Sequence, residues 1–129
     1  DDKSAKARTM DIAKKTITFM IGSSTDPKIV AEISEQVKNK RTLVILDSDH
    51  SRDHVLKELE SYAPLVNVGS YLIVQDSNVN GHPVFPEHGP GPMEAIKAFL
   101  ASVKDFEIDA ERERLLNTTN PQGYLKRVR

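Results

Sequence analysis

The chain has 129 residues with 18 basic and 19 acidic side chains, which leave a formal net charge of −1. This length allows one domain at most, and the balanced charge lacks the basic excess of a nucleic-acid-binding protein. Because the chain has no cysteine and no apolar run near the roughly 20 residues of a membrane-spanning helix, disulfides and a membrane span are excluded and a cytoplasmic location is expected.

The first part of the chain alternates strand and helix patterns. Residues 1–15 are highly charged and predict a disordered stretch. The β-branched and aromatic run 16–21 (TITFMI) predicts a strand, which ends at the turn GSSTDP. Residues 28–40 carry apolar side chains at helical spacing and predict an amphipathic helix. Asp26 is its expected N-cap, with Pro27 at the first helical position.

Two short apolar runs then end in polar, acidic residues. Residues 43–46 (LVIL) lead into DSDH, and residues 71–74 (YLIV) lead into QDSN. Runs of this kind suit buried strands of a parallel sheet, whose carboxyl ends are where ligands bind. Between them, residues 52–62 predict a helix capped by Ser51. Two oxygen-rich strand ends predict one shared site, which would suit a hard cation such as Mg²⁺.

The rest of the chain predicts a long loop and a sheet that ends in antiparallel strands. Residues 77–92 hold three glycines, four prolines and two histidines, and an ordered loop of that length in a compact domain is usually functional. Pro92 begins a helix with an apolar stripe, and residues 106–108 predict a short strand. Residues 115–129 predict a closing strand or hairpin around NPQG. The whole order predicts a doubly wound α/β sheet.

Each candidate group also has a purely structural interpretation. Asp47 can be a cation ligand or can cap the following helix. His50 can be a general base, a metal ligand, a stacking partner for a bound ring, or a surface residue. His54 is expected to face solvent or pack along its helix. His82 and His88 suit substrate contact better than a core position, although loop histidines are often simply solvated.

The turn GSSTDP offers hydroxyls and backbone N–H groups at a helix N-terminus. Such a turn can bind polar or anionic ligand groups, or it can be only a helix cap. It is not a phosphate-binding fingerprint, because neither GxGxxG nor GxxxxGK[ST] occurs in the chain.

Five segments in this order resemble the cephalosporin hydroxylase / rhamnosyl O-methyltransferase family: GSSTDP, VILDSDHSRDHV, YLIVQDSNVNGHPV, GPGPMEAI and NPQGYLKR. The resemblance runs from about Ile17 to Val128, and the layout is also similar to that of catechol-type O-methyltransferases. It implies a Rossmann-like class I methyltransferase fold with S-adenosylmethionine and Mg²⁺ as cofactors. It also implies methyl transfer to a sugar or other small-molecule hydroxyl, while the family name records hydroxylation as the alternative reaction, and it is compatible with a homo-oligomer.

The resemblance implies a cofactor site built from two turns. Ser23, Ser24 and Thr25 would line the adenine end of the pocket. Ser48 and Asp49 would border the cofactor and the acceptor, although Asp49 is also placed to cap the next helix.

The resemblance implies a metal site next to that pocket. Its ligands would be Asp47, Gln75 and Asp76, and His50 would remove the acceptor's proton. The family usually has an acidic residue where Gln75 stands; an amide oxygen can still coordinate a hard cation but carries no charge. The loop that holds the two histidines named above would cover the acceptor.

The family also has segments that are expected upstream of the residues that carry the resemblance. These are the glycine-rich loop that holds the methionine part of the cofactor and a second strand with a ribose-binding acid, whose end would lie near Asp1 and Asp2. We therefore expect the chain to be the C-terminal portion of a longer enzyme. Alone, it would have an open sheet edge and bind the cofactor weakly or not at all.

Two other functions fit parts of the sequence. The run VILDSDHS is similar to the D-x-D motif of haloacid-dehalogenase-type phosphatases, with QDSN as the later acidic group. The spacing of about thirty residues leaves no room for the lysine and cap that normally intervene. The third hypothesis is a Rossmann-like remnant or binding module without turnover.

Overall fold

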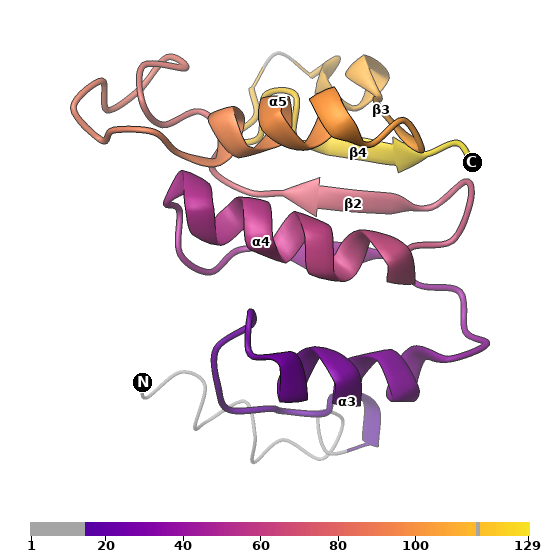
Figure 1. Cartoon of the computed structure of the whole chain (residues 1–129). Coiled ribbons are helices and arrows are strands. Elements are labelled where there is room, and N and C mark those ends of the chain that lie inside the picture. Colours follow the sequence, from indigo (N-terminus) through magenta and orange to yellow (C-terminus); the bar gives the residue numbers. More distant parts are fainter. Residues whose placement is uncertain (1–14, 116) are drawn as a thin grey trace.

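The computed structural model describes residues 15–115 and 117–129, which form a four-stranded mixed sheet and three α-helices (Figure 1). The strands are β1 (Val44–Leu46), β2 (Tyr71–Val74), β3 (Phe106–Ile108) and β4 (Tyr124–Arg127). The helices are α3 (Pro27–Val37), α4 (Arg52–Tyr62) and α5 (Pro92–Ser102), with short 3₁₀ turns η1 (Ala63–Leu65) and η2 (Ala110–Glu113). The predicted α/β class is confirmed, and the arrangement is consistent with a Rossmann-like fold.

The order of strands in the sheet is β1-β2-β4-β3. Strands β1 and β2 are parallel, with Leu46 opposite Val74 at their carboxyl ends, whereas β4 runs antiparallel to both β2 and β3. The predicted mixture of parallel and antiparallel strands is therefore present. Because β1 and β2 end at the same edge, the residues that follow them meet in space.

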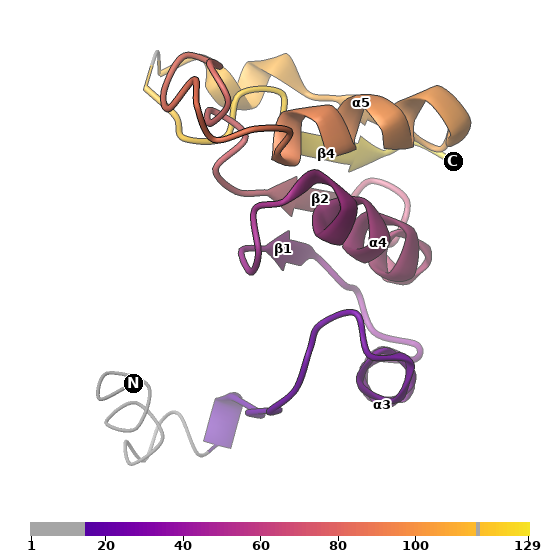
Figure 2. The same ribbon diagram turned by 60° about the vertical axis from the view of Figure 1, so that its left-hand side comes forward.

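One face of the sheet is covered by α4 and α5, which lie side by side across it (Figures 1 and 2). Along β2 the side chains alternate, so that Leu72 and Val74 are buried while their neighbours are only half-buried. The residues that fill the core between sheet and helices are fully or almost fully buried: Leu59, Leu72, Ile96, Phe99 and Leu125. Helix α3 stands apart at the β1 edge and has no buried residue, although Val30 and Ile33 pack partly against the core.

The strand predicted over 16–21 is wrong. Residues 17–21 form no strand, and Ile17 and Ile21 are 51% and 79% exposed. A β-branched run becomes a strand only when a neighbouring strand accepts its backbone hydrogen bonds. The four described strands pair only with one another in the order above, so this segment belongs to no ladder.

The other elements differ from their predictions mainly at their ends. The helix predicted over 28–40 stops at Val37, because Asn39 adopts a left-handed conformation (φ 61°) that cannot continue a helix. Asp26 is the N-cap as predicted and accepts a hydrogen bond from the Lys28 N–H. The predicted closing strand is β4, which is a central strand rather than half of a hairpin within the tail.

The charged stretch at residues 1–14 lies outside the described residues. Within the described ranges, no helix combines the length and apolar character needed to cross a membrane.

Candidate functional site

Two carboxylates and an imidazole meet at the carboxyl ends of the parallel strands. Asp47 follows β1 directly, and Asp76 lies two residues beyond β2. The His50 Nε2 atom is 3.5 Å from Asp47 Oδ1 and 3.4 Å from Asp76 Oδ2. One donor atom from each of the three side chains lies within 4.8 Å of the others. The two acidic strand ends thus lie together in space, as the parallel pairing requires.

The three side chains of this cluster differ in their exposure to solvent. The carboxylates are open, with exposed side-chain fractions of 57% for Asp47 and 37% for Asp76. The His50 ring is 31% exposed overall, but its Nε2 atom is buried and has no hydrogen-bond partner among the described residues. A buried ring nitrogen that faces two carboxylates without bonding to either is an unusual arrangement, because buried polar atoms are normally satisfied.

Backbone hydrogen bonds hold the second strand end in position. The Gln75 N–H donates to Leu46 O (3.0 Å) and links the two strand ends. Asp76 has a left-handed backbone (φ 50°), and its N–H donates to the Asn120 side-chain oxygen at 3.0 Å. Asn120 is itself buried. It is a positioning residue that the sequence reasoning missed, although its segment NPQG was recognised as a motif.

The turn between β1 and α4 is shaped by Asp49. Its carboxylate accepts a hydrogen bond from the Ser51 N–H (2.8 Å), and the hydrogen bonds from Ser51 lower the pKa of Asp49. Ser51 is the N-cap of α4 but makes no side-chain capping bond. Asp49 therefore supports the helix start, and its carboxylate does not join the Asp47 cluster.

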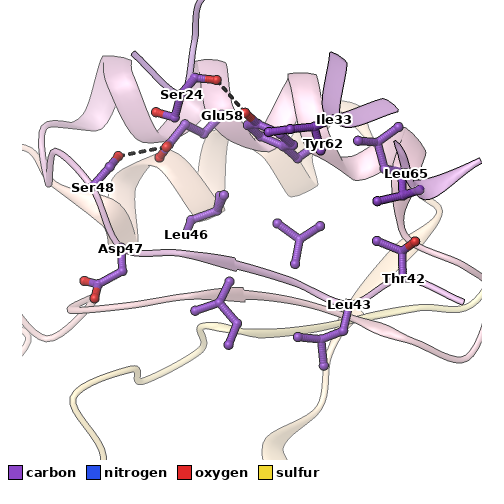
Figure 3. Close-up of a pocket in the computed structure, with 13 residues that line it drawn as sticks. Ser24, Ile33, Thr42, Leu43, Leu46, Asp47, Ser48, Glu58, Tyr62 and Leu65 are labelled. Carbon is purple, nitrogen blue, oxygen red and sulfur yellow. Dashed lines mark hydrogen bonds between the residues drawn. The ribbon is translucent and has the colours of Figure 1, made fainter. Parts of the chain in front are cut away.

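A cavity of about 450 Å³ lies beside the cluster, between β1, α3 and α4 (Figure 3). Its walls are largely apolar, formed by Ile33, Leu43, Leu46 and Leu65 among others. Its polar lining comes from the turn before α3, from the turn after β1 and from α4: Ser24, Asp47, Ser48, Glu58 and Tyr62. Asp47 thus belongs both to the cavity wall and to the cluster with His50.

Glu58 is the second group that sequence reasoning missed. Its side chain is 2% exposed; Oε1 accepts a hydrogen bond from the Ser48 hydroxyl (2.7 Å), while Oε2 is buried without a partner in the described part of the chain (Figure 3). The spacing could have revealed it. Glu58 lies three residues after Val55 and four before Tyr62, and both of these are buried on the inner face of α4.

The GSSTDP turn contributes one residue to the cavity. Ser24 lines it, and the Ser24 carbonyl oxygen accepts a hydrogen bond from the Tyr62 hydroxyl (2.7 Å). The Ser24 hydroxyl also lies 3.1 Å from His54 Nε2, so His54 contacts this turn rather than simply facing solvent. Ser23 and Thr25 bond to each other through their hydroxyls (3.0 Å) and do not line the cavity.

The loop at 77–91 packs against the start of α4. The Pro90 carbonyl oxygen accepts a hydrogen bond from the Arg52 N–H (3.0 Å), and a Cβ added at Gly91 would lie 3.3 Å from His50 O. His82 is turned toward α5, with Nε2 2.7 Å from a Glu94 oxygen, whereas His88 lies near Gly89 O (3.2 Å). The loop therefore lies close to the cluster, but His82 is already engaged by the helix.

Glu94 connects this loop to α5 and makes stability depend on pH. Burial raises its pKa, but hydrogen bonds from the Gly91 N–H, the His82 ring and other donors outweigh burial and bring the pKa to about 2. Its pKa in the unfolded chain is near the ordinary 4.5. The stabilisation is therefore complete above about pH 4.5 and is lost as pH falls toward 2.

We expect Glu94→Gln to lower the free energy of unfolding at pH 7 by on the order of 2 kcal/mol. The gap between parent and variant should shrink as pH falls from 5 to 3, because the parent loses its advantage when Glu94 takes up a proton. Urea unfolding at several pH values measures this. Glu87→Gln, which changes an exposed carboxylate of the same loop, is the matched control. A constant gap across this pH range would contradict the account of Glu94.

The parallel strands bring carboxylates, an imidazole and a cavity together at their carboxyl ends, which is the place where α/β proteins commonly bind their ligands. A family model for rhamnosyl O-methyltransferase/CmcI proteins matches residues 1–128. The chain therefore belongs to the rhamnosyl O-methyltransferase/CmcI family.

Curated relatives carry the same family name. The chain is 47% identical over 116 residues to the rhamnosyl O-methyltransferases of Mycobacterium tuberculosis H37Rv and Mycobacterium bovis BCG, covering 86% of this chain and 47% of each relative. It is 44% identical over 116 residues to that of Mycobacterium leprae, covering 86% of this chain and 50% of the relative. The chain thus spans about half the length of the curated relatives it matches. No solved structure matches it significantly.

Proposed function

We propose that the chain forms part of an S-adenosylmethionine-dependent O-methyltransferase that uses a divalent cation, Mg²⁺ in the simplest case, and methylates a sugar or other small-molecule hydroxyl. The observation that carries the proposal is the double position of Asp47. This carboxylate lies in the cluster with His50 and Asp76 and also lines the adjacent cavity. A cation at the cluster and a cofactor in the cavity would therefore be neighbours.

The cluster has the donors that a divalent cation needs. Two accessible carboxylates supply negative charge, and the unpartnered His50 nitrogen faces them. Hard cations in proteins are commonly held by one or two carboxylates, with water or substrate oxygens completing the shell. Asp47 and Asp76 would hold the ion, and Gln75 could add an amide oxygen, as the family resemblance implies.

The cavity has the character of a nucleoside pocket. Ligand sites are mostly apolar with a few convergent polar groups, and this cavity follows that pattern. Its apolar walls suit the flat face of an adenine ring. The hydroxyls of Ser24 and Ser48 and the buried Glu58 carboxylate could bind the polar groups of the cofactor. Ser23, Thr25 and Asp49 would not touch the cofactor but would fix the shape of the turns that carry Ser24 and Ser48.

The proposed chemistry is activation and alignment of a hydroxyl. A bound divalent cation lowers the pKa of a coordinated hydroxyl, and S-adenosylmethionine supplies the methyl group on a positively charged sulfur. The protein's own part is positioning, which can account for much of the acceleration. His50 stands where its ring nitrogen could take the acceptor's proton or hold the cation. The loop at 77–91, with His82 and His88, would cover the acceptor and exclude water.

The nature of the acceptor is suggested by the relatives. The curated proteins at 47% identity are named for transfer to a rhamnosyl group. A rhamnosyl hydroxyl is therefore the first acceptor to test. A sugar presents neighbouring hydroxyl oxygens, and the open carboxylates of the cluster leave space on a bound cation for such oxygens.

A chimera tests the proposal directly. The segment of the M. tuberculosis relative that this chain does not match would be fused ahead of it, because the family resemblance implies a glycine-rich loop upstream. We expect transfer of a labelled methyl group from S-adenosylmethionine to a rhamnosyl glycoside, dependent on added divalent cation. The 129-residue chain alone should bind the cofactor weakly or not at all by calorimetry. A folded chimera that binds S-adenosylmethionine without transferring methyl groups would instead support a binding module.

The phosphatase hypothesis gains no specific support. In that reaction the second Asp of D-x-D acts as an acid or base beside the first. Here the Asp49 carboxylate is bonded to the Ser51 N–H and lies outside the cluster that Asp47 forms.

A further inference from the structure

His50 occupies the centre of the cluster. We propose that His50 is itself a cation ligand, through Nε2, and that the site therefore takes a borderline transition-metal ion such as Co²⁺, Ni²⁺, Zn²⁺ or Fe²⁺ in preference to Mg²⁺. This inference rests on the proposed function, because it specifies the cation of the same site. It assigns the His50 nitrogen to metal binding rather than to proton transfer.

The distances between the donor atoms support coordination. Hydrogen bonds from a ring nitrogen to an oxygen usually measure about 2.7–3.2 Å. The His50 Nε2 atom stands farther away, at 3.5 Å from Asp47 Oδ1 and 3.4 Å from Asp76 Oδ2. Two ligands that each lie roughly 2.0–2.2 Å from a shared metal ion stand about 3.0–3.5 Å apart in octahedral or tetrahedral geometry. Both distances from the ring nitrogen are therefore those of neighbouring ligands around one ion, and the donor atoms of the two carboxylates lie within 4.8 Å of each other.

The burial of the ring nitrogen supports the same role. Nε2 is buried and lacks a hydrogen-bond partner among the residues described, although carboxylates lie on two sides of it. A general base needs this atom open to the acceptor's hydroxyl, within hydrogen-bond reach. Here the atom is buried and lies within 3.5 Å of a carboxylate oxygen of both Asp47 and Asp76. An ion bound by the two carboxylates would meet that nitrogen and satisfy it.

The donor set determines which cation fits. Mg²⁺ prefers an all-oxygen shell, whereas imidazole suits Zn²⁺, Fe²⁺, Ni²⁺ and neighbouring ions. The second strand end supplies one carboxylate, from Asp76, because position 75 is the neutral Gln75. Two carboxylates balance the double charge of the ion, and a neutral imidazole adds a softer ligand without further charge. The site therefore combines charge for any divalent ion with a nitrogen that distinguishes among them.

The experiment uses the 129-residue chain with Co²⁺ and Mg²⁺ as probes. Calorimetry gives the affinity for each ion, and proton NMR of the Co²⁺-loaded chain detects the strongly shifted ring N–H signal of a coordinated histidine. We expect Co²⁺ to bind more tightly than Mg²⁺ and one such signal to appear. His50→Ala should lower the Co²⁺ affinity at least about tenfold, lower the Mg²⁺ affinity less than about threefold, and remove the signal. His88→Ala, an exposed loop histidine, is the matched control.

Three results would overturn the inference: Co²⁺ binding that is absent, Co²⁺ binding that survives His50→Ala, or equal losses for both ions. The variant Asp47→Asn distinguishes two outcomes: that His50 is not a ligand, and that no cation binds at this cluster. If Asp47→Asn abolishes Co²⁺ binding and His50→Ala does not, the cation site stands and His50 is not a ligand. If Co²⁺ binds but neither substitution matters, the cation lies elsewhere, and the cation-assisted part of the proposed function fails as well. Circular dichroism verifies that each variant is folded.

Discussion

Replacing Asp47 by alanine in the chimera should reduce methyl transfer about a thousandfold or more. A divalent cation contributes several kcal/mol of charge stabilisation, and each 1.36 kcal/mol corresponds to a factor of ten in rate. Asp47 is one of only two carboxylates in the described cluster, and it also lines the cavity proposed for the cofactor. Its loss would remove cation charge at the point where the two sites adjoin. Initial rates with labelled S-adenosylmethionine and a rhamnosyl glycoside measure the effect.

The control for this variant is Asp53→Ala. Asp53 lies in the first turn of α4, its side chain is 86% exposed, and it is paired with Arg52 outside the cluster. Asp53→Ala changes the net charge by the same amount as Asp47→Ala. Because Asp53 lies on the surface outside the cluster, this substitution should leave the rate within about twofold. Unchanged activity in Asp47→Ala would show that the cluster does not serve the reaction. If the carboxylate is a direct ligand, the variant should also need a higher cation concentration to reach its own maximal rate.

Much of the site geometry could be predicted from local sequence because parallel pairing brings strand ends together. The runs before Asp47 and Gln75 are short, apolar and rich in β-branched residues, and a helical pattern separates them. Those features alone require two parallel strands with their carboxyl ends at one edge. The structure has this arrangement, with Leu46 opposite Val74.

The failed prediction at residues 16–21 shows the limit of local patterns. The run TITFMI has the composition of a strand, but a strand also needs a partner, and this segment pairs with none of the four described strands. A β-branched composition shows that a segment can form a strand when another strand lies beside it. Composition does not show whether such a partner strand is present.

Glu58 and Asn120 were missed for a different reason. Both are polar residues whose role comes from contacts outside their own local segment. The Glu58 carboxylate accepts a hydrogen bond from the Ser48 hydroxyl. The Asn120 side-chain oxygen accepts one from the Asp76 N–H, 44 residues away in sequence. A polar side chain is expected to be exposed unless it has a partner, and the partners of these two residues are visible only after folding. Helical spacing could have placed Glu58 on the inner face of α4, but it does not identify Ser48 as its partner. The position of His50 between two carboxylates is a long-range result of the same type.

The turn that holds Asn120 also requires glycine at its end. The Gly123 O accepts a hydrogen bond from the Val74 N–H (2.9 Å), so the backbone of the turn lies directly against the end of β2. A Cβ added at Gly123 would overlap the Val74 carbonyl oxygen and would lie 3.1 Å from Asn120 O. Both obstacles are backbone atoms, which cannot move aside as the end of a flexible side chain can. Space, rather than backbone conformation, therefore requires glycine here.

We expect Gly123→Ala to lower the free energy of unfolding by about 3 kcal/mol or more, since overpacking against fixed backbone costs 1–3 kcal/mol and sometimes more. The midpoint of urea unfolding should fall by roughly 1–2 M. The matched control is Gly69→Ala, where a Cβ meets nothing within 4 Å and only the positive φ of 81° is unfavourable, at a cost of about 1 kcal/mol. Equal effects of the two substitutions would contradict the steric account. Because Asp76 depends on Asn120 in the same turn, Gly123→Ala should also weaken Co²⁺ binding, whereas Gly69→Ala should leave it unchanged.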